Sequence, residues 1–165
     1  MPGAEQEPEA WRAPMRSRVL DLPPGTEAAD AVARGRCAIG GVVAPAPESL
    51  DEALAAVADR HGERFAARLR RFAALPEGTF VWTREADGCY RLGRLAGPWR
   101  YEADHEELDL PHARPARWLD DRLAEEDVPP SVAETFGRGG RNLQRIHDPD
   151  AGPASAALWR AATGA

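Results

Sequence analysis

The sequence has 165 residues and contains no lysine. Its 21 positively charged side chains, histidine not counted, are all arginines. Without lysine, the chain has neither a nuclease core of the Asp…Glu-x-Lys type nor a phosphate-binding loop of the Walker type. It has only two cysteines, Cys37 and Cys89, which lie 52 positions apart and make no metal-ligand spacing. This cysteine usage favours a reduced, cytoplasmic protein without disulfides.

Long apolar runs are also missing. No stretch approaches the roughly 20 residues of a membrane span. The first ten residues are acidic and lack the apolar core of a secretory signal. We therefore expect neither a membrane partner nor export. The histidines form no metal-ligand pattern, so we expect no metal and no cofactor. They are His61, His105, His112 and His147.

The most informative stretch runs from Gly78 to Glu102. Two apolar and aromatic runs, Thr79–Thr83 and Cys89–Leu95, flank an Ala-Asp-Gly turn signal, and this pattern predicts a β-hairpin. After a Gly-Pro bend, Trp99 and Tyr101 lie two positions apart, so on a strand they would share one face.

The remaining segments predict the order of elements. Residues 1–14 are rich in Pro, Glu and Ala and are expected to be a disordered tail. Residues 15–150 are expected to form one domain and residues 151–165 a C-terminal helix. Within the domain, the alternating residues 16–22 predict a first strand, and two helices are predicted over 49–61 and 63–75. This order predicts an α+β fold, a small curved sheet or β-barrel flanked by helices.

Two of the predicted elements carry marked patterns. In the helix over 63–75, apolar residues occupy one face and arginines occupy another. The arginines of that face are Arg64, Arg68 and Arg71. The segment His112–Leu119 alternates like a strand but contains Pro115, which cannot donate to a ladder, so it is predicted as an edge strand.

Charge is distributed unevenly along the chain, although the net charge is −6. From Arg60 to Arg100, nine arginines stand against four acids, a balance of +5; from Tyr101 to Pro130, three arginines stand against ten acids, a balance of −7. The basic part contains the hairpin and suits an anionic partner, but both blocks are also explained as solvated surface.

Four short motifs lie along the chain. They are Ala-Ile-Gly at 38–40, Gly-x-Phe-Val-Trp-Thr-Arg at 78–84, Tyr-x-Leu-Gly-Arg-Leu-x-Gly-Pro-Trp-Arg-Tyr at 90–101, and His-x-Arg-Pro-x-x-Trp-Leu at 112–119. Together they resemble the PUA-like superfamily. More narrowly, the chain is similar to EVE and YTH-like modules and to the N-terminal domains of some Mrr- and McrB-type restriction endonucleases. The resemblance spans about residues 36–147. It implies a compact β-barrel, flanked by helices, that binds a modified or flipped base of DNA or RNA in an aromatic pocket.

The hairpin and the resemblance together predict a base pocket formed by Trp82, Trp99, Tyr101 and Gly41. Stacking on such rings contributes about 1–3 kcal/mol per base. In the resembling modules an aromatic residue often follows the Ile-Gly pair. Here that position is Gly41, so the wall is missing or another side chain supplies it. The alternative is that these aromatic residues fill the core, as most strand aromatics do.

Arginines are expected to bind the phosphates, because a guanidinium can hold a phosphate in a bidentate way. The candidates are Arg84, Arg94, Arg100, Arg138 and Arg141. The last two lie in the glycine loop 137–141, which is either an anion nest or a simple connector. Asn142 and Gln144 are candidates for reading a base edge, although such amides also serve as ordinary loop or cap residues.

These patterns predict a noncatalytic nucleic-acid-binding module that reads a modified or flipped base. DNA is expected in preference to RNA, and a separate effector chain is a further candidate partner. The alternative is a protein-interaction or regulatory domain whose aromatic surface binds a partner chain. No catalytic constellation supports an enzyme; Cys37 or Cys89 beside a histidine in a cleft would be the exception.

Overall fold

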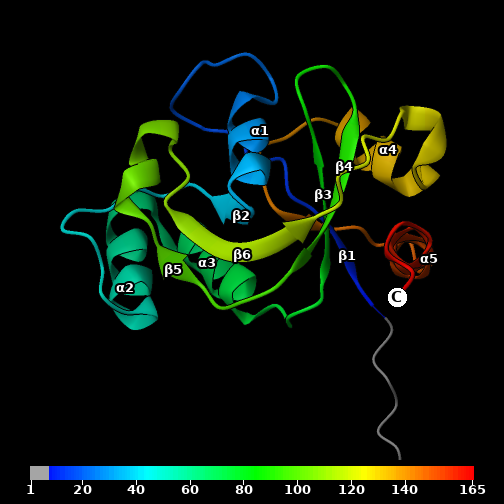
Figure 1. Ribbon diagram of the computed structural model, residues 1–165. Coiled ribbons are helices and arrows are strands. Elements are labelled where there is room, and N and C mark those ends of the chain that lie inside the picture. Colours follow the sequence, from blue (N-terminus) through cyan, green and yellow to red (C-terminus); the bar gives the residue numbers. More distant parts are fainter. Residues whose placement is uncertain (1–7) are drawn as a thin grey trace, which may run out of the picture.

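The structure, a computed structural model, describes residues 8–165. Its centre is a seven-stranded sheet that curls across the molecule, with helices packed around it (Figure 1). The strands are β1 (Ala10–Arg12), β2 (Arg36–Ile39), β3 (Phe80–Arg84), β4 (Tyr90–Leu95), β5 (Arg100–Tyr101), β6 (His112–Trp118) and β7 (Gln144–Arg145).

The sheet is mixed and open. Its order is β2-β6-β4-β3-β1-β7, with β5 also paired to β6. The predicted hairpin is present as β3 and β4, in which Trp82 lies opposite Leu92. Every strand pairing is antiparallel except that of β1 with β3. Because β2 and β7 stand at opposite ends of this order, the chain forms a curved sheet rather than a closed barrel.

The helices flank this sheet, so the predicted α+β class with a curved sheet and flanking helices is confirmed. They are α1 (Thr26–Ala33), α2 (Leu50–His61), α3 (Glu63–Ala74), α4 (Pro130–Gly137) and α5 (Ala151–Thr163), with short 3₁₀ turns η1 (Ala103–Leu108) and η2 (Glu125–Asp127). The start of α2 follows the predicted capping pattern, because the side chain of Ser49 accepts a 3.1 Å hydrogen bond from the backbone N–H of Glu52.

Strand β6 is the long curved strand that crosses the front of the molecule in Figure 1. It pairs with β2 along one side, and with β5 and then β4 along the other. The prediction of an edge strand is therefore wrong. Pro115 is tolerated in the interior because Ala116 donates to the carbonyl of Gly35, just before β2, so the N of Pro115 faces the opposite side, toward the gap between β5 and β4. On that side of β6 only the carbonyl of Pro115 is needed as a hydrogen-bonding group, and the backbone N–H of Ala96 donates to it at 2.8 Å.

The N-terminal segment differs from its prediction. Residues 1–7 of the expected tail lie outside the described residues, but β1 is buried and lies between β3 and β7. Its start packs closely on α5, since a Cβ at Gly152 would lie 1.6 Å from the carbonyl oxygen of Pro8. The strand predicted over 16–22 is absent, and that segment is irregular.

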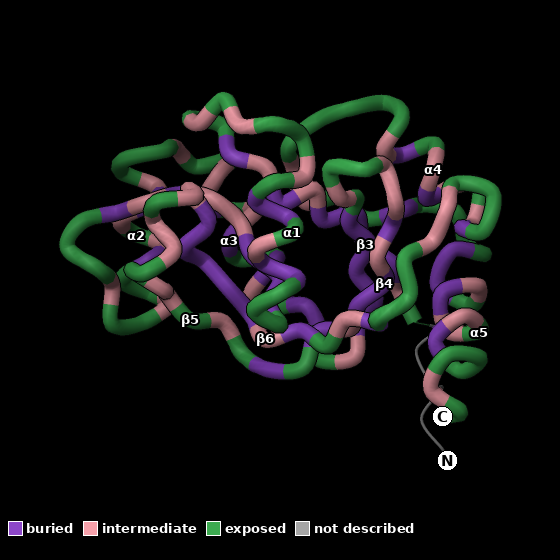
Figure 2. Tube along the Cα trace, turned by 45° about the horizontal axis from the view of Figure 1, so that its top comes forward, coloured by how far each residue is buried: buried purple, intermediate pink, exposed green. Residues whose placement is uncertain are grey.

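Buried apolar residues form three clusters, and Figure 2 shows which segments of the chain are buried. One lies between the sheet, α1 and the end of α3, and includes Phe72 and Val81. A second joins the hairpin to α4 and α5 and includes Trp159. The third holds α2 against α3 and receives Trp99 and Tyr101. Helix α3 thus contributes to two clusters and is fixed between them.

A buried arginine anchors the end of α3. The Nη1 of Arg114 donates to the carbonyls of Phe72 at 3.0 Å and Leu75 at 2.5 Å, and its Nε donates to Gly97 at 2.8 Å. Burial lowers the pKa of Arg114, with smaller opposing contributions from nearby groups. These bonds satisfy carbonyls that the helix end leaves free, and they position the rest of α3 beside the cavity described next.

A candidate ligand-binding cavity

Trp82 does not line a pocket. Its side chain is fully buried in the cluster beneath α5, and its Nε1 donates a 2.9 Å hydrogen bond to Oγ of Ser155. Residues Phe80 to Thr83 are all buried, so both faces of β3 are covered. A strand that is covered on both faces leaves its aromatic side chains no route to solvent.

Trp99 and Tyr101 lie in a different cluster and surround a histidine instead of an open slot. The Nε1 of Trp99 donates to Nδ1 of His112 at 3.2 Å, and the ring of Tyr101 meets the His112 ring edge-on at 5.1 Å. The Tyr101 hydroxyl lies 2.7 Å from the carboxylate of Glu106. Burial raises the pKa of Tyr101 to about 12, and the hydrogen bond to Glu106 is the second largest cause of this increase. The predicted slot between Trp82 and Trp99 is therefore not formed.

Three of the predicted phosphate-binding arginines are occupied within the protein. Arg84 donates to the carbonyl of Gly88 and lies over the ring of Tyr90. Arg94 donates to the carbonyl of Gly78 and lies over the ring of Phe80. Arg100 pairs with a carboxylate in the network described in the next paragraph. None of these three side chains lines the cavity that is described below.

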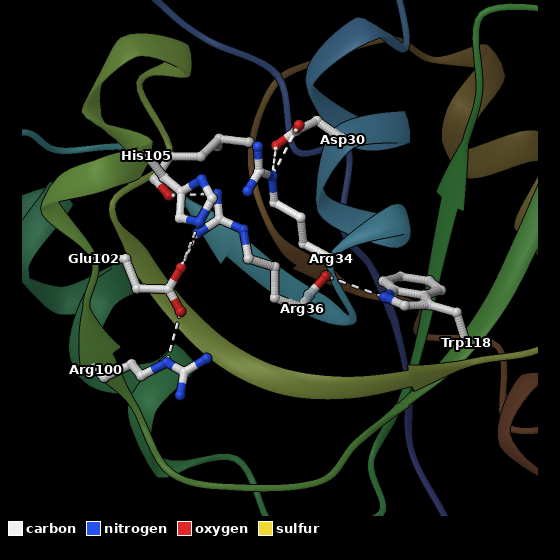
Figure 3. A network of polar contacts seen from close by, with 8 residues as sticks. Asp30, Arg34, Arg36, Arg100, Glu102, His105 and Trp118 are labelled. Carbon is white, nitrogen blue, oxygen red and sulfur yellow. Dashed lines mark hydrogen bonds and ion pairs between the residues drawn. The ribbon is translucent and has the colours of Figure 1, made fainter.

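The network around Arg100 is built on a shared carboxylate (Figure 3). Glu102 accepts from Arg100 at 2.6 Å and from the buried Arg36 at 2.7 Å, and it lies 2.9 Å from His105. Burial would raise the pKa of Glu102, but the Arg100 hydrogen bond and the charges of Arg36 and Arg100 together lower it. Trp118 donates to the Arg36 carbonyl at 3.0 Å, so this network joins β2, β5 and β6.

The cavity lies on the other side of β2, beside α3. Its volume is about 70 Å³. It brings together three residues that the sequence had indicated separately, Gly41, Arg141 and Asn142. Its apolar lining comes from segments far apart in the chain, namely Met15, Ile39, Phe65, Leu110 and Leu143. One base-pocket candidate, one phosphate candidate and one base-edge candidate thus meet here, without the aromatic residues predicted for the pocket.

Phe65 supplies the wall that a larger residue at position 41 would have supplied. Gly41 has φ of +107°, and a Cβ there would lie 2.9 Å from Cε1 of Phe65. Phe65 is half-buried on α3, and the guanidinium of Arg18 lies 5.3 Å from its ring centroid. One face of the Phe65 ring therefore already holds a planar cation.

Four arginines converge on the cavity, which Asp109 also lines. Within residues 8–165, none of the cavity arginines forms an ion pair; these are Arg16, Arg18, Arg68 and Arg141. Burial lowers the pKa of Arg68, and the positive charges of Arg18 and Arg64 lower it further. Such mutual repulsion is relieved when an anion binds.

The segment that bounds the cavity is held by polar contacts and carries backbone strain. Arg18 donates to Oδ1 of Asn142, and Arg141 donates to the carbonyl of Ser17 at 2.8 Å. The described non-glycine residues with positive φ are Met15 and Asp109, and both line the cavity. Strained backbone of this kind is concentrated at functional sites.

The remaining predicted residues lie outside this cavity. Gln144 accepts a 2.6 Å hydrogen bond from Arg12, and Arg138 borders a second hollow together with Gln144. The sequence analysis missed Arg18 and did not assign Phe65 or Arg68 to a site. The arginine face predicted for residues 63–75 was the signal that pointed toward Arg68.

In residues 8–165, no three His, Cys, Asp or Glu side chains come close enough to hold a metal ion. No helix in this part of the chain has both the length and the apolar composition needed to cross a membrane.

Comparisons of the chain with protein-family models, curated proteins and solved structures gave no match. The resemblance to the PUA-like superfamily therefore stays a prediction.

Proposed function

We propose that the chain is a noncatalytic nucleic-acid-binding module of PUA-like fold that inserts one base into the cavity beside Phe65. The observation that carries this proposal is the cation–π contact of Arg18 with Phe65 at a cavity whose arginines form no ion pairs within the described residues. An apolar floor with a π surface suits a base, and the surrounding guanidinium groups suit its phosphates. The expected ligand is DNA in preference to RNA, in the cytoplasm, and an effector chain is a further candidate partner.

Insertion of a base requires Arg18 to move. A cavity of about 70 Å³ holds only about two water molecules, at roughly 30 Å³ each. The base would take the place of the Arg18 guanidinium on the Phe65 ring. The released guanidinium would then bind a phosphate of the same strand. Arg18 is exposed, and its neighbour Val19 is 81% exposed at the rim, so this displacement disturbs no core packing.

The competing function, a protein-interaction domain with an aromatic surface, has less support. Trp82 is buried, and Trp99 and Tyr101 are half-buried against α2 and α3. Val19 is the exposed large hydrophobic residue among the described residues. A docking face for a partner chain needs a contiguous apolar patch, and a single valine at a cavity rim does not provide one.

Fluorescence polarisation with labelled single-stranded and duplex oligonucleotides, plain and base-modified, tests this function. The measurements are made at low salt, where phosphate contacts are strongest. The variant Phe65→Leu keeps apolar volume but removes the stacking face. We expect it to weaken binding by roughly 5- to 150-fold, which corresponds to about 1–3 kcal/mol of base stacking.

The matched control is Phe136→Leu. Phe136 is a half-buried aromatic that contacts Tyr90 and does not line the cavity. We expect this variant to bind as the wild type does. Absence of binding to every oligonucleotide at low salt would overturn the proposal, and so would equal binding by Phe65→Leu and the wild type.

A further inference from the structure

Helix α3 carries a row of arginines along one flank. Arg64, Arg68 and Arg71 follow each other at spacings of four and three residues, so they share one helical face. Their Cα atoms span ~10 Å along the helix axis at 1.5 Å per residue. This distance is comparable with the rise of about three stacked nucleotides at 3.4 Å each. We call these three residues the α3 arginine row.

The α3 arginine row has no internal counter-charge. In the described part of the chain, none of its three side chains makes a hydrogen bond or an ion pair with another residue. Arg64 and Arg71 are exposed, and Arg68 is half-buried at the cavity. Elsewhere on the surface Arg34 and Arg122 are paired with acids, whereas Arg70 and Arg160 form no ion pair within the described residues.

The row connects two hollows. Arg68 lines the cavity of Phe65, whereas Arg71 lines the second hollow, which has a volume of about 640 Å³. Arg138 and Gln144 also border this second hollow. It contains acidic side chains too, among them Glu134 and Asp148, so its charge is mixed. Helix α3 thus lies between the two hollows and places Arg68 at the first and Arg71, one turn later, at the second.

We infer that the α3 arginine row binds the phosphodiester backbone of the strand whose base enters the cavity, and so sets the path by which the strand leaves it. This inference rests on the proposed function. A phosphodiester strand fits because it offers one negative charge per nucleotide at a spacing that the row can follow. Guanidinium groups hold such phosphates through charge-assisted hydrogen bonds.

The test measures binding of a ten-nucleotide single strand that contains the base preferred by the wild type, over a range of salt concentrations. The double variant Arg64→Gln/Arg71→Gln removes two charges from exposed, unpaired side chains. The control is Arg70→Gln/Arg160→Gln, which also removes two exposed, unpaired charges. Arg70 lies on the same helix but is turned by roughly 120° from Arg64 at 100° per residue, and Arg160 lies on α5.

We expect the row variant to bind the ten-nucleotide strand about tenfold more weakly at low salt than the control. The slope of log affinity against log salt should also fall by about 1.4, at 0.7 per lost phosphate contact on a single strand. Binding of the corresponding mononucleotide should be unchanged, because its single phosphate lies at the cavity.

The outcomes separate the two proposals. If the wild type binds no oligonucleotide, the proposed function itself fails. If the wild type binds but the row variant and the control have equal affinities and equal salt slopes, only the role of the row is overturned. Binding of an acidic peptide by the row with higher affinity than the strand would also overturn it, in favour of a protein partner. Circular dichroism of both variants checks that each is folded.

Discussion

The indole Nε1 of Trp82 donates a 2.9 Å hydrogen bond to Oγ of Ser155, and this contact joins β3 to α5 in the protein interior. Both side chains are fully buried, and Ser155 in turn donates to the carbonyl of Ala151 at 2.7 Å. The tryptophan that the hairpin pattern had indicated as a ligand wall therefore holds the C-terminal helix on the sheet.

The first prediction concerns this contact. Ser155→Ala leaves the buried indole N–H without an acceptor, so we expect the free energy of unfolding to fall by about 1–3 kcal/mol. Urea unfolding of the single variants and of Trp82→Phe/Ser155→Ala measures it, because removing both partners should cost less than the sum of the two single changes. Additive effects in this cycle would show that the hydrogen bond contributes nothing.

The second prediction concerns Gly41. Gly41→Ala places a Cβ 2.9 Å from the Phe65 ring at a φ of +107°, so both contact and backbone strain oppose it. Gly62→Ala is the matched control, because Gly62 has φ of +97° and nothing within 4 Å of a Cβ. We expect Gly41→Ala to destabilise the protein by roughly 1–3 kcal/mol, and by more than Gly62→Ala does. Equal thermal shifts would mean that Phe65 moves aside freely.

The third prediction concerns pH. Burial lowers the pKa of His112 to about 4, and the hydrogen bond to the Gly41 carbonyl opposes this only in part. The Nε2 of His112 lies 2.8 Å from that carbonyl, while Nδ1 accepts from Trp99 at 3.2 Å. A neutral ring with its proton on Nε2 satisfies both contacts, and a second proton on Nδ1 would oppose the Trp99 N–H.

The direction in which pH changes the stability follows from comparing the pKa of His112 in the folded and unfolded states. The unfolded chain takes up a proton near pH 6.5, and the folded chain only near pH 4. The contribution of neutral His112 is therefore fully present above pH 6.5 and is lost as the pH falls to 4. The loss is about 3 kcal/mol. Urea unfolding between pH 7.5 and 4 should show a flatter profile for His112→Gln than for the wild type.

Two other histidines set the controls for this measurement. The pKa of His105 is also lowered, mainly by burial, so a smaller slope in the same direction should remain in His112→Gln. His147→Gln replaces an exposed histidine and serves as the matched substitution control. A wild-type profile that is flat between pH 6.5 and 4 would contradict a buried neutral His112.

The fourth prediction concerns the thiols. Cys37 is fully buried in β2, and burial raises its pKa to about 12, against a smaller opposing effect of Arg114. Cys89 is half-buried beside the hairpin turn. Because the thiolate is the reactive form, a thiol reagent at pH 8 should label Cys89 in the native protein and Cys37 only after unfolding. Rapid labelling of both residues without denaturant would contradict the buried position of Cys37.

The sequence predicted the elements whose signals are local. The capping pattern at Ser49, the arginine face of α3 and the Asp-Gly turn of the hairpin each depend on residues a few positions apart. It did not predict β1, because three residues are too few to show a period and their partners lie about 70 and 130 positions away.

The cavity was predicted only in fragments for the same reason. Gly41, Arg141 and Asn142 were indicated separately, but what joins them is packing between segments that are distant in the chain. The burial of Trp82 depends on α5, which covers the outer face of β3. The alternation of β3 alone could not show that a helix 70 residues later would close that face.

The position of β1 between β3 and β7 has a consequence for biosynthesis. The ribosome translates Ala10–Arg12 about 130 residues before their partner β7, which ends at Arg145. At 5–20 residues per second, these residues wait on the order of ten seconds before β7 is translated. During that interval the outer edge of β1 has no partner strand, so its backbone N–H and C=O groups stay free to pair with another chain until β7 completes the sheet.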